Sequence, residues 1–304
     1  MLWGTAFPGI KAGYAWFHVE NHAIGAKLLF AGLRFLIAGL LVLAIGTIRR
    51  KPGQTMRLKK SDLPSLSLLG FFQTFLQYLL LYLGISGVSG TKSALYTSAA
   101  SFATVLASPL LFRQDRLTIR KIAGCTVGVV GIVLMSVHDG GADGFTLAGD
   151  GLVILSNLSG AAGNLVSKKI ATPQRTASYI AGWQLTLGGT GLMGAGLLAG
   201  GSLSFEALNG WLILLYLAAM AGIAFMIWTE LLRRHPVSKV AVYNLLIPVF
   251  GTIWSGIFLG EQVVTLSNAT ALILVCSGIF LVNFVPTHSN HEKEGMADET
   301  NQKR

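Results

Sequence analysis

Few side chains that can carry a charge or a proton lie inside the apolar segments of this sequence. Lys11, Arg34 and Glu230 fall within such segments, Asp150 lies near the start of one, and Glu261 follows the end of another. Ionisable groups are costly inside a membrane, so they usually face a cavity or a charged partner. Each of them is therefore a candidate for substrate binding or proton coupling, with a structural role as the alternative.

Lys11 is the clearest binding candidate, because an ammonium group can attract the carboxylate of a substrate. The alternative is that Lys11 extends to the outer membrane interface, and the sequence leaves both roles open. Arg34 lies about six residues into its predicted span. We expect Arg34 to extend to the interface or to support helix packing.

The two carboxylates near span ends favour structural roles. Glu230 precedes Arg233 and Arg234 at spacings of three and four residues, which permit local ion pairs on a helix. Glu261 stands at a helix end, where we expect a structural or capping role. Proton coupling through a buried acid therefore has little support, and facilitated diffusion stays open beside it.

Aromatic and amide side chains more commonly shape a pocket for a small organic molecule. Tyr78 and Tyr82 share a helix face, and Gln73 and Gln77 add amides to the same run. With Lys11, the predicted substrate-binding residues are Trp3, Tyr78, Tyr82, Tyr96, Asn157, Asn164, Trp183, Tyr243 and Asn244. Any one of these residues is more often a packing residue, but the set exceeds what a lipid-facing surface needs. Pro248 removes a backbone hydrogen bond and is expected to kink its helix next to the cavity.

The composition places these residues in a membrane protein. Of 304 residues, 52% are hydrophobic and 12% are charged, about half the charge of a soluble domain. The net charge of +10 could suggest a nucleic-acid partner. However, most of the 23 Lys and Arg form clusters that follow apolar segments, as cytoplasmic loops do under the positive-inside rule. The predicted partners are the lipid bilayer and a small-molecule substrate, with no nucleic acid.

Ten apolar runs are long enough, or nearly so, to cross a bilayer. They lie at about 1–17, 28–48, 64–86, 92–112, 119–137, 149–167, 178–199, 209–232, 237–259 and 265–285. The basic clusters follow the even-numbered runs, which predicts a plasma-membrane protein with both termini in the cytoplasm. The first run would span only about 25 Å and lacks the features of a signal peptide, so we expect residues upstream of it.

An internal repeat organises these runs. Residues 91–135 align without a gap with 238–282, and Lys92, Tyr96 and Ser108 meet identical residues there. The repeat predicts two five-helix units at 1–140 and 147–285, followed by a disordered cytoplasmic tail at 286–304. Because five is odd, the second unit must cross the membrane in the opposite direction. The predicted fold class is an all-α membrane protein with ten transmembrane helices as two inverted repeats, an arrangement typical of secondary transporters.

Three segments resemble a known family. "LWGTAFPGIK", "LRFLIAGLL" and "NLLIPVFGTIWSGIFLGE" are similar to motifs of EamA-type members of the drug/metabolite transporter superfamily. The resemblance implies a ten-helix transporter of small metabolites, often an exporter of amino acids, with a cavity lined by both halves. The family's Gly-Glu is kept at Gly260–Glu261, whereas the first half has Arg113–Gln114 at that place.

These observations predict an efflux permease for amino acids or similar amphipathic metabolites that works by alternating access. Multidrug or sugar-type cargo is the alternative, and a receptor or scaffold would leave the inverted duplication unexplained. An intramembrane enzyme is disfavoured, because all six histidines lie in loops or at span ends and no HExxH motif is present. No catalytic residue, metal or cofactor is predicted, and the protein is expected to be a monomer or a homodimer.

Overall fold

The computed structural model describes residues 10, 13–20, 23–112, 117–138, 145–204, 208–240, 243, 246–259 and 265–283. Within these ranges every regular element is a helix. The elements are α2 (Ile24–Ile48), α3 (Leu63–Gly70), η1 (Phe71–Leu76), α4 (Gln77–Gly84), η2 (Ile85–Gly87), α5 (Gly90–Leu111), α6 (Ile119–His138), η3 (Leu147–Gly151), α7 (Leu152–Ile170), α8 (Ala177–Leu198), α9 (Leu208–Arg234), α10 (Val237–Val240), α11 (Leu246–Leu259) and α12 (Leu266–Asn283).

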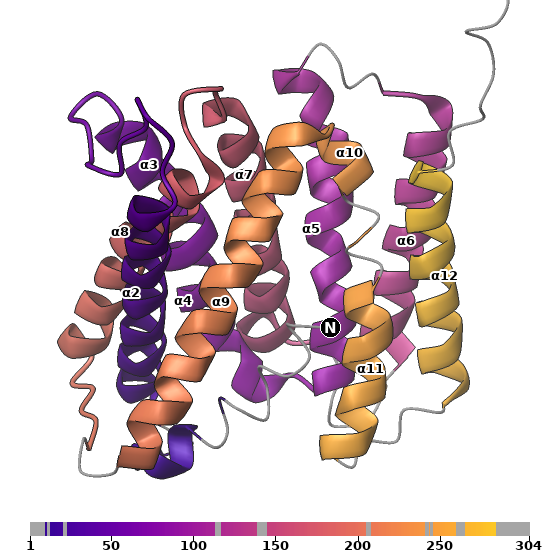
Figure 1. Ribbon diagram of the computed structural model, residues 1–304. Coiled ribbons are helices and arrows are strands. Elements are labelled where there is room, and N and C mark those ends of the chain that lie inside the picture. The colour runs from indigo at the N-terminus through magenta and orange to yellow at the C-terminus, as the bar shows by residue number, and fades with distance from the viewer. Residues whose placement is uncertain are drawn as a thin grey trace, which may run out of the picture.

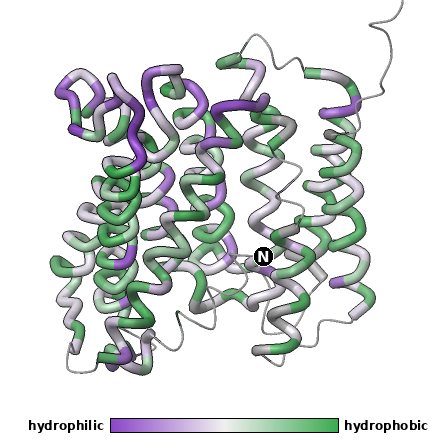
Figure 2. The backbone as a smooth tube through the Cα atoms, viewed as in Figure 1, coloured by the Kyte–Doolittle hydropathy of each residue, from purple (hydrophilic) through white to green (hydrophobic). Residues whose placement is uncertain are grey.

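The long helices stand side by side, with α2, α8 and α9 toward one side of the bundle and α6 and α12 at the other (Figure 1). Apolar residues cover most of their length, and hydrophilic residues gather at one end (Figure 2). That end holds the loops 49–62 and 171–176 and residues 233–236, and it is called the basic end below. Such a distribution suits a bundle whose middle faces lipid.

Glycines bring α2 and α8 into direct backbone contact. A Cβ atom on Gly32 would lie 2.3 Å from the backbone nitrogen of Met193. Gly25 at the start of α2 meets Gly201, just beyond the end of α8, whereas Gly46 near the end of α2 meets Ser178, so the two helices are antiparallel. Small residues are the usual means by which membrane helices pack this closely.

Glycines also bring α6 and α12 into close backbone contact. The backbone of Gly278 lies against Gly124 and Gly128. Gly131 meets Ala271 further along, so this pair of helices is also antiparallel.

The helices coincide within a few residues with the predicted runs from residue 28 onward, with two informative differences. Helix α2 begins at Ile24 instead of residue 28. The predicted run 237–259 is described as α10 and α11, and Pro248 is the third residue of α11. Residues 241, 242, 244 and 245 lie outside the described residues, so the expected kink at Pro248 stays a prediction.

Four helical stretches among the described residues are long and apolar enough to cross a membrane: Ile24–Ile48, Leu63–Gly84, Gly90–Leu111 and Leu208–Arg234. Leu266–Val282 is apolar but shorter. The other described helices are shorter or less apolar than those four stretches. The ten membrane crossings therefore stay a prediction.

The α2–α8 contact can be tested with Gly32→Ala. The added methyl group would meet backbone atoms of α8 that cannot move aside, and overpacking of this kind costs about 1–3 kcal/mol. We expect a lower melting temperature for the purified protein in detergent. Gly194→Ala is the matched control on α8, because a Cβ atom there meets nothing within 4 Å. Equal melting temperatures for the two variants would contradict the contact.

The predicted orientation can be tested by labelling single cysteines in a variant without Cys125 and Cys276. Lys51 and Ser202 are both exposed, and they follow α2 and α8 at opposite ends of the bundle. We expect a membrane-impermeant maleimide to label Lys51→Cys only from the cytoplasm and Ser202→Cys only from outside. The reverse pattern would overturn the assignment from the positive-inside rule.

Candidate functional site

A buried cluster of amide and indole groups joins three helical elements inside the bundle. Gln73 on η1 donates from Nε2 to Oδ1 of Asn164 on α7 over 2.8 Å, and Trp228 on α9 donates from Nε1 to the same oxygen over 2.9 Å. Gln73 and Asn164 are 5% and 8% exposed. These three residues are called the amide cluster, and they lie six or more residues from the basic ends of their helices.

Local backbone geometry positions the amide cluster. Residues Phe71–Leu76 form a π-helical turn between α3 and α4, a feature that often occurs at functional sites. The hydroxyl of Ser159 donates to the carbonyl of Phe72 in that turn over 2.7 Å. Gly163 on α7 lies against Gln73, where a Cβ atom would be 2.5 Å from that of Gln73. The glycine therefore lets α7 approach closely enough for Asn164 to reach Gln73.

An aromatic group lies beside the amide cluster, between α2, α4 and α9. The ring of Phe35 is centred 4.4 Å from that of Tyr78 and 6.2 Å from that of Phe225. Tyr82 continues the row at 6.4 Å from Tyr78. Arg34 places its guanidinium carbon 4.4 Å from the centroid of the Phe35 ring, within the range of a cation–π interaction. Tyr78 and Tyr82, two predicted site residues, are thus brought together with a buried arginine.

Other predicted site residues lie elsewhere. Tyr96 is fully buried and donates to Asp150 over 2.7 Å. Asn157 donates to the carbonyl of Val153 in its own helix. Trp183 donates to the carbonyl of Met56 at the basic end, and Tyr243 is 56% exposed. Trp3, Lys11, Asn244 and Glu261 lie outside the described residues.

Asp150 is stabilised from several sides. Besides Tyr96, the backbone N–H of Thr146 donates to Asp150 over 2.8 Å, and the Thr146 hydroxyl donates over 3.2 Å. Lys92 is close enough to attract the carboxylate electrostatically. This buried acid is therefore fully engaged in holding η3 to α5.

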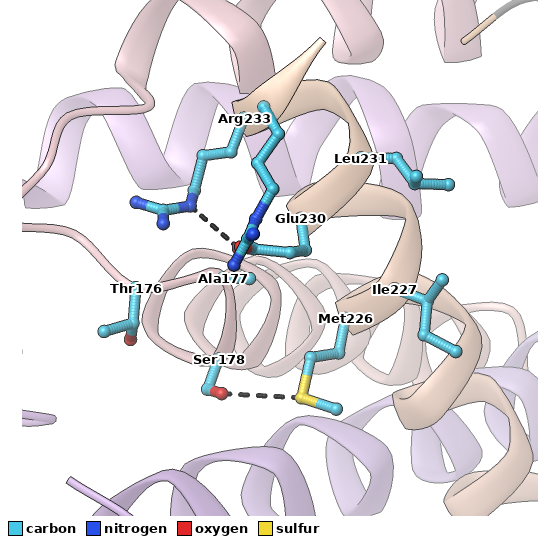
Figure 3. Close-up of a pocket in the computed structure, with 9 residues that line it drawn as sticks. Thr176, Ala177, Ser178, Met226, Ile227, Glu230, Leu231 and Arg233 are labelled. Carbon is cyan, nitrogen blue, oxygen red and sulfur yellow. Dashed lines mark hydrogen bonds and ion pairs between the residues drawn. The ribbon is translucent and has the colours of Figure 1, made fainter.

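At the basic end, a surface groove of about 440 Å³ runs between α8 and α9. Figure 3 shows Glu230 and Arg233 on one side of it and Thr176 to Ser178 on the other. Glu230 accepts from Nε of Arg233 over 2.8 Å and from Nε of Arg234. These are the local ion pairs that the spacing of Glu230 predicts.

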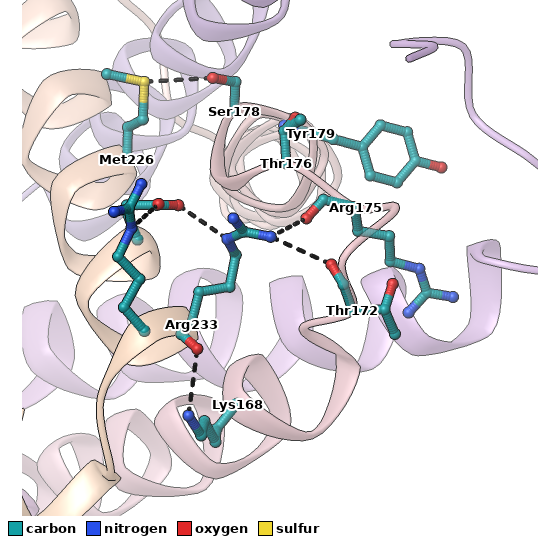
Figure 4. Close-up of polar contacts among 10 residues, drawn as sticks. Lys168, Thr172, Arg175, Thr176, Ser178, Tyr179, Met226 and Arg233 are labelled. Atoms are coloured by element: carbon teal, nitrogen blue, oxygen red, sulfur yellow. Dashed lines mark hydrogen bonds and ion pairs between the residues drawn. The ribbon is translucent and has the colours of Figure 1, made fainter. Parts of the chain in front are cut away.

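Arg233 extends this network to the loop 171–176, and Lys168 joins it to the end of α9 (Figure 4). Nη1 of Arg233 donates to the carbonyl oxygens of Thr172 and Arg175, over 3.2 and 3.0 Å. Lys168 donates to the carbonyl of His235 over 2.9 Å. The ends of α7, α8 and α9 are thereby tied together.

Asp62, just before α3, connects the first half of the chain to the second. It accepts from Arg175 over 2.7 Å and from the hydroxyl of Tyr179 over 2.9 Å. Burial raises the pKa of the Asp62 carboxyl, but the hydrogen bonds from Tyr179 and Arg175 outweigh burial and hold the pKa below its ordinary value. Asp62 therefore stays ionised at neutral pH.

The sequence gives partial signals for what the predicted set omits. Gln73 stands out as an amide within an apolar run, and Asp62 directly precedes the Leu63–Pro64 start of α3, a typical helix-start pattern. Nothing local in the sequence joins Asp62 to Arg175. Among the described residues, no three His, Cys, Asp or Glu side chains form a group that could hold a metal ion.

Long apolar helices, glycine-mediated helix contacts and buried amides define a multi-pass helical membrane protein. A family model described as "EamA-like transporter family" matches residues 1–137 and, a second time, residues 147–284. The chain therefore belongs to the EamA-like transporter family, whose members are transporters and not enzymes.

Curated relatives cover nearly the whole chain. A "Probable amino-acid metabolite efflux pump" of Salmonella typhimurium is 27% identical over 92% of this chain and 91% of its own length. A protein with the same description from Escherichia coli is 25% identical over 92% and 91%. "Uncharacterized transporter YvbV" of Bacillus subtilis is 28% identical over 93% and 88%.

A solved crystal structure has the same fold. It superposes with a TM-score of 0.65 at 20% identity, over 92% of this chain and 98% of that chain.

The Asp62 network yields a pH-dependent prediction. Asp62→Asn removes the charge that Arg175 and Tyr179 bind, and we expect a loss of roughly 1 kcal/mol at neutral pH, because the pair is partly screened by solvent. A depressed pKa contributes stability above the ordinary carboxyl value of about 4, and that contribution is lost as the pH falls below it. Melting temperatures of wild type and variant should therefore converge in acid.

Glu20→Gln is the control for Asp62→Asn, because Glu20 is an exposed carboxylate away from this network. A difference between wild type and Asp62→Asn that stays constant down to the lowest pH at which both fold would contradict the ionised pair.

Proposed function

We propose that this chain is a secondary transporter in which two inverted five-helix repeats move small metabolites by alternating access. The amide cluster carries the proposal. Gln73 belongs to the first half of the chain, whereas Asn164 and Trp228 belong to the second, so their shared hydrogen bonds lie at the interface of the halves. Secondary transporters with inverted repeats bind substrate at such an interface.

Two further observations support inverted repeats. The family matches the chain twice, over 1–137 and 147–284. Helices at corresponding places of the two matches, α2 with α8 and α6 with α12, pack antiparallel to one another. Because each repeat has five helices, an odd number, corresponding helices must cross the membrane in opposite directions.

The proposed cargo is an amino acid or a similar amphipathic metabolite, and the proposed direction is export from the cytoplasm across the plasma membrane. The amides of Gln73 and Asn164 supply hydrogen-bond donors and acceptors, and Tyr78, Phe35 and Phe225 supply apolar walls. Two relatives described as probable amino-acid metabolite efflux pumps support this choice over sugars and drugs.

The cargo can be tested with the purified protein in proteoliposomes. We expect labelled amino acids with apolar side chains to exchange across the membrane, whereas a monosaccharide and a lipophilic cation do not. Movement of the sugar or the cation alone would replace the proposed cargo with the multidrug or sugar-type alternative. Movement of none of the panel would contradict transport by this chain.

The amide cluster can be tested with Asn164→Ala. This change removes the oxygen that accepts from both Gln73 and Trp228, and each lost hydrogen bond to a buried group costs about 1–3 kcal/mol. We expect the transport rate to fall about tenfold or more at unchanged reconstitution efficiency. Leu158→Ala is the matched control on the same helix, because the side chain of Leu158 is exposed. Equal rates in the two variants would remove the amide cluster from the transport site.

A further inference from the structure

Arg34 lies deep inside the bundle. Helix α2 begins at Ile24, so Arg34 is ten residues, or about 15 Å, from the start of the helix and fourteen residues from its end. The side chain is only 4% exposed. Extension of this arginine to the membrane interface, one of its two expected roles, is therefore not what the structure shows.

The charge of Arg34 lacks a counterion among the described residues. Its Nε is buried without a hydrogen-bond partner, and none of the ion pairs in the described part of the chain involves it. By contrast, Arg175 is paired with Asp62 and Arg233 with Glu230. A buried guanidinium without an anion is costly, so its retention at this depth calls for an occupant that supplies the charge.

The groups around Arg34 indicate which kind of hydrogen-bonding partner the site needs. Tyr14, Tyr78 and Tyr82 pack in one cluster with Phe35, and the Arg34 guanidinium lies over the Phe35 ring. The Tyr14 hydroxyl lies beside Tyr82 and has no other hydrogen-bond partner among the described residues. A guanidinium N–H can only donate, and a tyrosine hydroxyl can donate as well. The unpartnered Nε–H of Arg34 therefore lies in one aromatic cluster with tyrosine donors, and the group that would satisfy it is an acceptor.

From this geometry we propose that Arg34 and Tyr14 bind the carboxylate of the transported substrate. The inference rests on the proposed transport function and names the substrate class of the same site. The guanidinium of Arg34 carries one positive charge, so one negative charge balances it. A carboxylate matches the planar guanidinium fork, whereas a phosphate dianion would leave a buried charge uncompensated.

The aromatic walls fit the rest of such a substrate. Phe35 covers one face of the guanidinium, and Tyr78 and Phe225 pack around Phe35. Phe225 is one turn before Trp228 on α9, so the Arg34 site and the amide cluster are neighbours. A substrate bound through its carboxylate at Arg34 would direct its remaining polar groups toward Asn164 and Gln73.

The test compares L-phenylalanine and L-leucine with their carboxamides, which keep the shape and lose the negative charge. Wild type should bind the amino acids more tightly than the amides, measured by thermal shift in detergent and by transport KM in proteoliposomes. Arg34→Gln should reduce this preference by about tenfold or more, because a charged hydrogen bond is lost. It should also raise the melting temperature without substrate, since a buried unpaired charge is removed.

Tyr14→Phe is the second variant and removes one hydroxyl only. It should weaken binding of the amino acids severalfold and binding of the amides less, because a hydrogen bond to a charged acceptor is the stronger one. A control variant, Tyr216→Phe, changes an exposed tyrosine on α9 and should alter neither.

The outcomes separate the two proposals. If wild type transports none of the amino acids, the proposed function fails. If wild type transports them and Arg34→Gln keeps the preference for carboxylates, the Arg34 site is wrong and the function stands. A preference that is lost in Lys11→Ala instead, or stabilisation of wild type by inorganic phosphate and by no carboxylate, would also overturn the Arg34 site.

Discussion

The backbone contact between α2 and α8 is the constraint on which the rest of the bundle depends. Gly25, Gly32 and Gly39 on α2 face the backbone or side chains of α8 at distances that exclude any side chain. Because α8 occupies that face so closely, the larger side chains of α2 pack elsewhere. Gly222 on α9 meets Val42 and Ala38, so α2 lies between two helices. Arg34 and Phe35 are thereby enclosed by protein and kept from lipid.

A second constraint is that buried polar groups must find partners within the bundle, since hydrocarbon offers none. The amide cluster meets this requirement through Asn164, which accepts two hydrogen bonds. In the π-helical turn, the Phe72 carbonyl accepts a hydrogen bond from the Ser159 hydroxyl. The oxygen of Asn164 already accepts two hydrogen bonds, whereas Nε of Arg34 is a buried donor without a partner among the described residues.

The sequence predicts most of the described helices because long apolar runs are local signals. The Glu230 ion pairs were equally predictable, since both partners lie within one turn of the same helix. Asp62 and Arg175 are 113 residues apart, and no local pattern links them.

The position of Arg34 was missed for a geometric reason. Four residues at the start of α2, about 6 Å of helix, move this side chain from the expected interface into the interior. The internal repeat also did not predict how exposed corresponding residues are. Tyr96 and Tyr243 correspond in sequence, yet one is fully buried and the other is 56% exposed. Equivalent positions in two halves meet different neighbours when the halves pack asymmetrically in one conformation.

Helix α9 passes the Arg34 site, the amide cluster and the basic end. It carries Phe225 beside the Arg34 site, Trp228 in the amide cluster, and Glu230 and Arg233 at the basic end. The helix is continuous from Leu208 to Arg234, so it moves as a rigid element over this range. A displacement that opens the groove between α8 and α9 must therefore break the Arg233 contacts with the loop 171–176 and shift Trp228 relative to Asn164. The groove at the basic end and the amide cluster are thereby linked through one helix, a link that the proposed alternating access requires.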